Sequence, residues 1–128
     1  MTLPALAWVG LGGAAGAMLR YAASLAFAGT AMALPWGTLF ANLAGCFGIG
    51  VLAELVARGM SVTPEARLFL ATGLCGGFTT MSSFIYELAG LWREGATVLA
   101  AAYLLATLVG SAVCFGLGAW ATHAIWRG

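Results

Sequence analysis

Neutral hydrogen-bonding side chains recur at helical spacing in an otherwise apolar sequence. Tyr103, Thr107 and Ser111 are four residues apart, so one face of a helix would carry three hydroxyl groups. Thr38 and Asn42 have the same spacing, which places a hydroxyl and an amide on one face of another helix. Such groups can replace the hydration water of a dissolved ion, or they can bond neighbouring helices together. The residues alone leave both interpretations open, for Asn42 above all.

The composition places these side chains in a membrane. Of 128 residues, 62% are hydrophobic and only 7% are charged, whereas about a quarter of the residues of a soluble domain are charged. The formal net charge is +1, and no cluster of basic residues occurs. We therefore expect a lipid bilayer as the surroundings and no nucleic acid as a partner.

The charges divide the chain into four spans. The charge-free stretches 1–19, 21–53, 68–86 and 95–126 can each reach across a bilayer, which takes about 20 helical residues. Four such helices leave no room for a soluble domain, so residues 1–128 should form a single four-helix transmembrane domain. Turn and cap residues predict helices at about 4–27, 36–58, 64–92 and 97–125, with a turn at 28–35.

Signals at the helix ends support these limits. Pro4 can occupy a first helical turn, where its missing N–H costs nothing. Arg58 and Gly59 are typical of a helix end, and Thr63 followed by Pro64 is typical of a helix start. The fold class expected is therefore an all-α membrane protein.

The arginine residues are distributed so evenly that they hardly favour one orientation of the chain in the membrane. With four spans, Arg58, Arg67 and Arg127 lie on one side of the membrane, and Arg93 and Arg20 lie on the other. The positive-inside rule depends on the difference in the number of basic residues between the two sides. A difference of three arginines against two is so small that insertion in both orientations is expected. An antiparallel, dual-topology homodimer would follow, since a two-fold interface uses the same surface patch twice.

The third span contains an irregular segment. Gly76 and Gly77 are followed by hydroxyl residues at 79, 80, 82 and 83, which makes a poor continuous helix. We expect a break near mid-membrane, where freed backbone carbonyls line a cavity or hold an ion. Close packing through glycine is the alternative interpretation.

Two charged residues lie within or beside the predicted spans. Arg20 is about 24 Å from Pro4 along a helix, near the far membrane boundary, so it can snorkel to water or line a vestibule. Glu87 lies toward the end of the third span, where it can be solvated at the interface or take part in a pathway. The cysteines are expected to act as small hydrophobic residues: Cys46, Cys75 and Cys114.

Three motifs occur in order along the chain: GGAAGAMLRY at 12–21, WGTLFANLAG at 36–45 and GGFTTMSSF at 76–84. Together they resemble the CrcB/Fluc family of fluoride channels over essentially the whole chain. The resemblance implies an antiparallel dimer in the bacterial inner membrane with two fluoride pores. Such a channel exports fluoride passively and protects the cell from fluoride that enters as HF.

The resemblance also assigns roles to residues. It implies a fluoride pathway along Asn42, Met81, Ser82, Ser83, Phe84, Tyr103, Thr107 and Ser111. Met81 departs from the family, which usually has a pore phenylalanine there, and a thioether cannot offer the positive ring edge of Phe84. A structural sodium ion would bind backbone carbonyls of Gly76 and Thr79 from both subunits.

Two other classes of protein fit part of the pattern. A small multidrug-type exporter has four short helices and dual topology, but it relies on a carboxylate in the first helix, where this chain has none. A non-transporting packing subunit should lack aligned polar side chains and a broken helix. We therefore expect a channel and not an enzyme.

Overall fold

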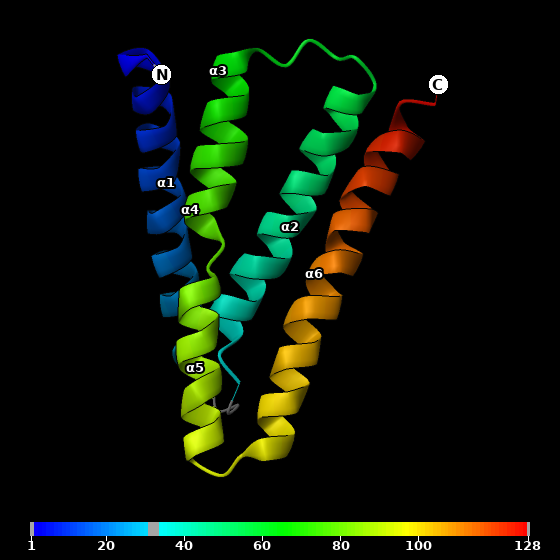
Figure 1. The fold of residues 1–128 in the computed structure, drawn as a ribbon. Coiled ribbons are helices and arrows are strands. Elements are labelled where there is room, and N and C mark those ends of the chain that lie inside the picture. Colours follow the sequence, from blue (N-terminus) through cyan, green and yellow to red (C-terminus); the bar gives the residue numbers. More distant parts are fainter. Residues whose placement is uncertain (1, 31–33, 128) are drawn as a thin grey trace.

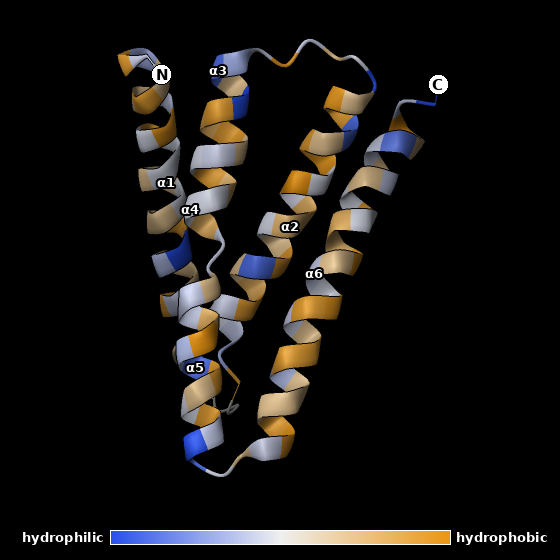
Figure 2. Cartoon of the chain, in the orientation of Figure 1, coloured by the Kyte–Doolittle hydropathy of each residue, from blue (hydrophilic) through white to orange (hydrophobic). Residues whose placement is uncertain are grey.

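Four long apolar helical segments make up the structure. The computed structural model describes residues 2–30 and 34–127, and Figure 1 shows their arrangement. Four segments of this part are long and apolar enough to cross a membrane: α1 (Leu3–Phe27), α2 (Trp36–Ala57), the composite segment Pro64–Arg93 and α6 (Thr97–Ile125). Hydrophobic residues cover most of each segment (Figure 2). The predicted spans are confirmed, whereas residues 31–33 of the predicted turn lie outside the described residues.

The composite segment consists of four elements in sequence. They are α3 (Pro64–Arg67), the π-helix η1 (Leu68–Cys75), α4 (Gly76–Phe78) and α5 (Met81–Arg93). Thr79 and Thr80 separate α4 from α5 and have extended backbone angles, φ −77° and ψ 154° for Thr79 and φ −152° and ψ 118° for Thr80. The Thr79 N–H keeps its helical bond to the Cys75 carbonyl at 3.0 Å, but the Thr80 N–H donates to Asn42, so the helical hydrogen bonding is interrupted after Thr79.

Local chemistry explains where the helices begin and end. The Thr63 hydroxyl accepts a hydrogen bond from the backbone N–H of Ala66 at 3.2 Å, which is the cap expected from the Thr-Pro-Glu sequence. Gly59 follows α2 with φ +70°, a conformation that glycine adopts without the steric cost of a side chain. The loop between α2 and α3 thus depends on residues whose types were evident in the sequence.

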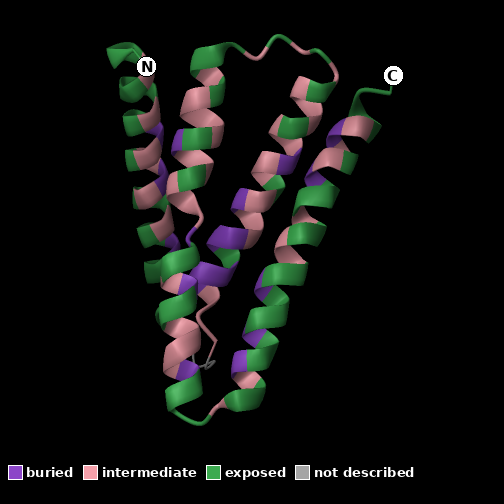
Figure 3. Ribbon diagram, viewed as in Figure 1, coloured by how far each residue is buried: buried purple, intermediate pink, exposed green. Residues whose placement is uncertain are grey.

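The helices form two close pairs. α1 packs mainly against η1 and α4, and α2 packs mainly against α6. The two pairs diverge toward the end that holds both termini, while α5 lies at the opposite end near the start of α6 (Figure 1). Buried residues lie on the surfaces where the helices face one another, and the outer surfaces are exposed (Figure 3). Such exposed apolar surfaces suit a lipid environment.

Glycine permits the close approach of α1 to η1 and α4. A Cβ atom on Gly73 would lie 2.8 Å from the Cα of Gly12, and one on Gly77 would lie 2.5 Å from the carbonyl oxygen of Gly13. Both distances are too short for a side chain, so the two backbones are in direct contact. Small residues at this interface thus allow the helices to touch along their backbones, as in other membrane proteins.

We predict that Gly73→Ala separates α1 from η1, because its methyl group would meet backbone atoms that cannot rotate away. Overpacking of this kind costs about 1–3 kcal/mol. Gly10→Ala is the matched control, since no atom lies within 4 Å of its added Cβ. Thermal unfolding in detergent should show a lower Tm for Gly73→Ala alone, and equal Tm values for the two variants would contradict the close contact.

Candidate functional site

A groove lies between the α2 and α6 pair and the middle of the composite segment. Its volume is about 400 Å³. The polar side chains that line it are Asn42, Thr79, Thr80, Thr107 and Ser111. Gly76 and Met81 also line it, together with apolar residues of all the neighbouring helices. The groove therefore brings together four of the predicted pathway residues and both predicted sodium-binding residues.

Asn42 forms a double hydrogen bond with the interrupted backbone. Its Nδ2 donates to the Thr80 carbonyl at 3.1 Å, and its Oδ1 accepts from the Thr80 N–H at 2.7 Å. Both residues are buried, so neither backbone group of Thr80 has water as an alternative partner. The side chain thus bonds α2 to the extended segment, while one of its N–H groups is not used in this pair.

The same segment changes the partners of two carbonyl groups. In a continuous α-helix, the N–H of Thr80 would donate to the Gly76 carbonyl, and the N–H of Ser83 would donate to the Thr79 carbonyl. Here the Thr80 N–H donates to Asn42, and the Ser83 N–H donates to Oγ1 of Thr80 at 3.1 Å. The carbonyls of Gly76 and Thr79 therefore lose their usual helical donors, which leaves their oxygens able to accept from elsewhere.

Thr80 is the functional residue that sequence reasoning missed. Its hydroxyl caps α5 and also contacts the hydroxyl groups of Ser83 at 3.1 Å and Ser82 at 3.3 Å. Ser82 is exposed and Ser83 is half-buried. A Thr that precedes a helix start by one residue is a common N-cap, and this signal was present in the sequence.

The half-buried Glu87 accepts hydrogen bonds from two hydroxyl groups. Thr38 donates to its Oε1 and Tyr103 donates to its Oε2, each at 2.8 Å. Thr38 and Tyr103 are both buried. α2 and α6 thus both direct hydroxyl donors toward the Glu87 carboxylate, and whether this residue takes part in a pathway stays a prediction.

Arg20 and Glu87 line a second cavity, at the other side of the segment break. This cavity has a volume of about 240 Å³ and is also lined by Ser24, Thr38 and Ser83. The two residues predicted for a vestibule thus face one space, which is lined by one cation, one carboxylate and four hydroxyl-bearing residues: Tyr21, Ser24, Thr38 and Ser83. Such a mixed lining binds neither sign of charge strongly.

The three aligned hydroxyl groups of α6, those of Tyr103, Thr107 and Ser111, have different surroundings. Tyr103 is fully buried, Ser111 is half-buried on the groove, and Thr107 is 4% exposed. Among the described residues, the Oγ1 of Thr107 has no hydrogen-bond partner. Thr122 of the same helix behaves in the ordinary way and donates to the Gly118 carbonyl at 2.9 Å. Thr107 therefore lines the groove and carries a buried hydroxyl that no described residue bonds.

Phe84 and Met81 lie in different surroundings. Phe84 is 1% exposed, and its ring meets that of Tyr103 edge to face with centroids 5.0 Å apart. Met81 is 62% exposed and lines the groove. Met81, the first residue of α5, therefore lies on the groove that Asn42 also lines, whereas Phe84 lies in the core.

The described part of the chain contains no group of three His, Cys, Asp or Glu side chains that could hold a metal ion. Cys46, Cys75 and Cys114 are free and half-buried. Any cation at the groove would therefore have to use neutral oxygen atoms, such as the backbone carbonyls described above.

Comparison with known proteins gives consistent matches. A family model described as "CrcB-like protein, Camphor Resistance (CrcB)" matches residues 7–119. A "Fluoride-specific ion channel FluC" of Chelativorans sp. (strain BNC1) is 48% identical over 117 residues, which cover 90% of this chain and 93% of the relative. One of Chlorobium phaeobacteroides (strain BS1) is 46% identical over 114 residues, 89% of each chain. One of Agrobacterium fabrum is 49% identical over 107 residues, 81% of this chain and 84% of the relative.

We predict opposite stability effects for two threonine variants of α6. Thr107→Val removes a hydroxyl that has no described partner, so Tm should stay unchanged or rise. Thr122→Val removes a hydrogen bond to the Gly118 carbonyl and should lower the free energy of unfolding by about 1 kcal/mol. Thermal unfolding of both purified variants measures the difference; a larger loss for Thr107→Val would mean that its hydroxyl is already bonded within the protein.

Proposed function

Because the chain belongs to the CrcB-like protein family, we propose that it is a fluoride-specific ion channel of the bacterial inner membrane. It is a multi-pass membrane protein whose function is transport and not catalysis. Fluoride that accumulates in the cell leaves passively through the protein, which protects the cell from fluoride toxicity. Its relatives carry the name of such a channel over more than four fifths of this chain.

The unused hydroxyl of Thr107 is the observation that carries this proposal. Fluoride is small and strongly hydrated, so a pathway must replace its water with hydrogen-bond donors. Thr107 offers such a donor beside the groove, between Tyr103 and Ser111 on the same helical face. The N–H of Asn42 that Thr80 does not use is a second donor on the same groove. Neutral donors of this kind bind an anion without trapping it.

The proposed pathway continues from the groove to the second cavity. Ser82, Ser83 and Phe84 lie at the start of α5, and Arg20 and Glu87 line the far space. The edge of the Phe84 ring carries partial positive charge and can face fluoride, whereas Met81 serves as an apolar wall. All eight proposed pathway residues belong to α2, α5 and α6.

An antiparallel homodimer completes this pathway in our proposal. The groove is bounded by α2, α6 and the composite segment but is open on one side, and the outer helix faces carry many exposed large hydrophobic residues. A second copy in the opposite orientation would close the groove and form a second, equivalent pathway. The single four-helix domain is then one half of the channel.

A sodium ion at the dimer centre would be structural. Residues 79 and 80 lie near the middle of Pro64–Arg93, which supports a break at mid-membrane depth. The carbonyls of Gly76 and Thr79 have lost their helical donors, so two oxygens from each subunit could surround the ion. Four neutral oxygens suit a hard monovalent cation. A fluoride reversal potential that followed the sodium gradient would contradict this structural role.

Fluoride efflux from liposomes that contain only this purified chain tests the function. We expect rapid efflux from the wild type and at least a tenfold reduction, on the order of 1.4 kcal/mol in the barrier, for Phe84→Ile and Thr107→Val. Asn42→Asp should stop efflux, because a carboxylate repels the anion and replaces N–H donors with acceptors. Thr122→Val is the matched control, since its hydroxyl bonds its own helix.

Each variant must first elute as a dimer of the wild-type size, because a folding defect would imitate a blocked pore. Wild-type efflux in both Phe84→Ile and Asn42→Asp would place the pathway on other helix faces. No efflux from the wild type would contradict the channel itself.

We predict that both orientations of the chain coexist in one membrane. A tag at the C-terminus should be accessible from both sides, and two lysines added beside Arg127 should force a single orientation. The lysine variant should then fail to dimerise unless an oppositely oriented partner is supplied. Access from one side only in the unmodified chain would contradict the antiparallel dimer.

A further inference from the structure

Two apolar clefts adjoin the first turns of the composite segment, and Arg67 lines both of them. The loop-side cleft has a volume of about 390 Å³ and is lined by Val62, Pro64, Arg67, Leu68, Ala71 and Thr72. The α2-side cleft has a volume of about 210 Å³ and is lined by Ile49, Leu52, Ala53, Val56, Arg67 and Ala71. Apart from Arg67 and Thr72, every residue of the two linings is apolar. One guanidinium group therefore borders two apolar spaces.

The spacing of residues in the sequence explains the apolar wall of the α2-side cleft. The residues that α2 contributes recur at intervals of three and four, so they lie on one helical face: Ile49, Leu52, Ala53 and Val56. The opposite wall comes from Arg67 and Ala71, which are four residues apart in the composite segment. Below the guanidinium, this cleft has only hydrocarbon side chains, which bind acyl chains in preference to water.

Arg67 lies at the depth of the lipid headgroups. It is the fourth residue of the span Pro64–Arg93, whose 30 residues extend over about 45 Å. A bilayer measures about 40–45 Å with its headgroups, and its hydrocarbon core is about 30 Å thick. Arg67 is about 17 Å from the middle of the span, outside the hydrocarbon core, whereas Ala71 lies within that core. The cation therefore lies at the level of phosphate groups, and the apolar walls below it lie at the level of acyl chains.

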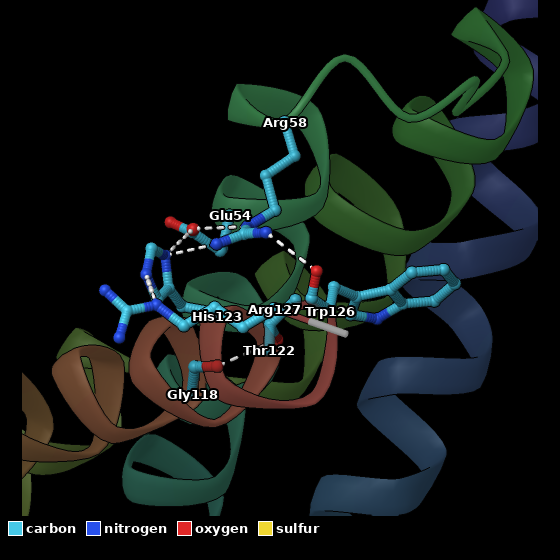
Figure 4. A network of polar contacts seen from close by, with 7 residues as sticks. All are labelled: Glu54, Arg58, Gly118, Thr122, His123, Trp126 and Arg127. Atoms are coloured by element: carbon cyan, nitrogen blue, oxygen red, sulfur yellow. Dashed lines mark hydrogen bonds and ion pairs between the residues drawn. The ribbon is translucent and has the colours of Figure 1, made fainter.

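The other two arginines at this end of the molecule already have partners. Arg58 and Arg127 belong to a polar network with Glu54 and His123, which joins the ends of α2 and α6 (Figure 4). Nε of Arg58 donates to Oε1 of Glu54 at 2.8 Å, and Nε of Arg127 donates to Nε2 of His123 at 2.9 Å. Within residues 2–30 and 34–127, no carboxylate forms an ion pair with the exposed Arg67.

The nearest acidic residue in the sequence does not compensate this charge. Glu65 precedes Arg67 by two residues, and side chains at this spacing do not face each other on a helix. The Arg67 guanidinium is therefore available to an anion from outside the chain.

We infer that the two clefts bind one anionic diacyl phospholipid, with its phosphate group on Arg67 and one acyl chain in each cleft. The planar guanidinium can donate two parallel hydrogen bonds to phosphate oxygens. Phosphatidylglycerol brings one negative charge to this one cation, whereas phosphatidylcholine also brings a cation of its own. Ile49 and Ala71 line both the α2-side cleft and the groove, so the lipid borders the groove from the membrane boundary.

Native mass spectrometry of the purified chain in detergent, titrated with phosphatidylglycerol, measures this binding without fluoride transport. We expect one tightly held lipid per chain, and about tenfold weaker binding of phosphatidylcholine. Arg67→Gln should weaken the binding of phosphatidylglycerol about tenfold, and Arg67→Lys should weaken it less, because lysine keeps the charge but lacks the planar fork.

Arg93→Gln is the matched control, since it removes an exposed guanidinium from the other end of the same segment. Its affinity for phosphatidylglycerol should equal that of the wild type. Equal affinities of the wild type for the two lipids, or equal affinities of Arg67→Gln and Arg93→Gln for phosphatidylglycerol, would overturn the lipid site.

Ala53→Trp tests the place of one acyl chain, because its ring would fill the α2-side cleft. The affinity for phosphatidylglycerol should fall about tenfold, whereas lysophosphatidylglycerol, which has one chain, should bind as it does to the wild type in the loop-side cleft. Val98→Trp is the control, since Val98 is 86% exposed and lines neither cleft.

Ala53→Trp also decides the question if Arg67→Gln does not fold. Unchanged affinity of Ala53→Trp for phosphatidylglycerol would overturn the inference. If this variant also lost the dimer in lipid-free detergent, a second copy of the chain would be the occupant of the cleft.

Discussion

The double hydrogen bond between Asn42 and Thr80 is the interaction on which the site depends. Within a bilayer, an extended backbone has no water to satisfy its N–H and C=O groups, and each unsatisfied group costs several kcal/mol. The Asn42 amide supplies both missing partners to Thr80. It thereby allows two residues between α4 and α5 to leave the helical conformation, and the carbonyls of Gly76 and Thr79 lose their helical donors as a result.

Two further polar residues of the site are compensated locally in the same way. Glu87 receives hydroxyl donors from Thr38 and Tyr103, and the Thr80 hydroxyl caps α5. Thr107 is the exception on the groove wall, since its buried hydroxyl lacks a described partner. A buried hydroxyl without a hydrogen-bond partner, beside polar groups that have partners, marks a place at which a ligand can accept a hydrogen bond. Our proposal of a fluoride pathway gives that hydroxyl a partner.

The close packing within each helix pair and the groove between the pairs both result from where glycine residues lie. Backbone contact at Gly12 and Gly73 draws α1 against η1, and Gly118 draws α6 against α2. Each pair of helices is therefore tight, while the two pairs diverge and leave the groove between them (Figure 1). The polar network around His123 stands at the divergent end, where side chains replace backbone contact (Figure 4).

The sequence by itself determined the helices, because their limits rest on local properties: apolar length, the Thr63 cap and the glycine after α2. It also indicated which polar residues matter, since a neutral donor in an apolar helix is conspicuous. Only the tertiary structure decided their partners. Asn42 and Thr80 are 38 residues apart, Thr38 and Glu87 are 49 apart, and Glu54 and His123 are 69 apart. Helical periodicity relates residues within one helix, whereas these contacts depend on how separate helices meet, and the same reason explains why Met81 and Phe84 face different surroundings.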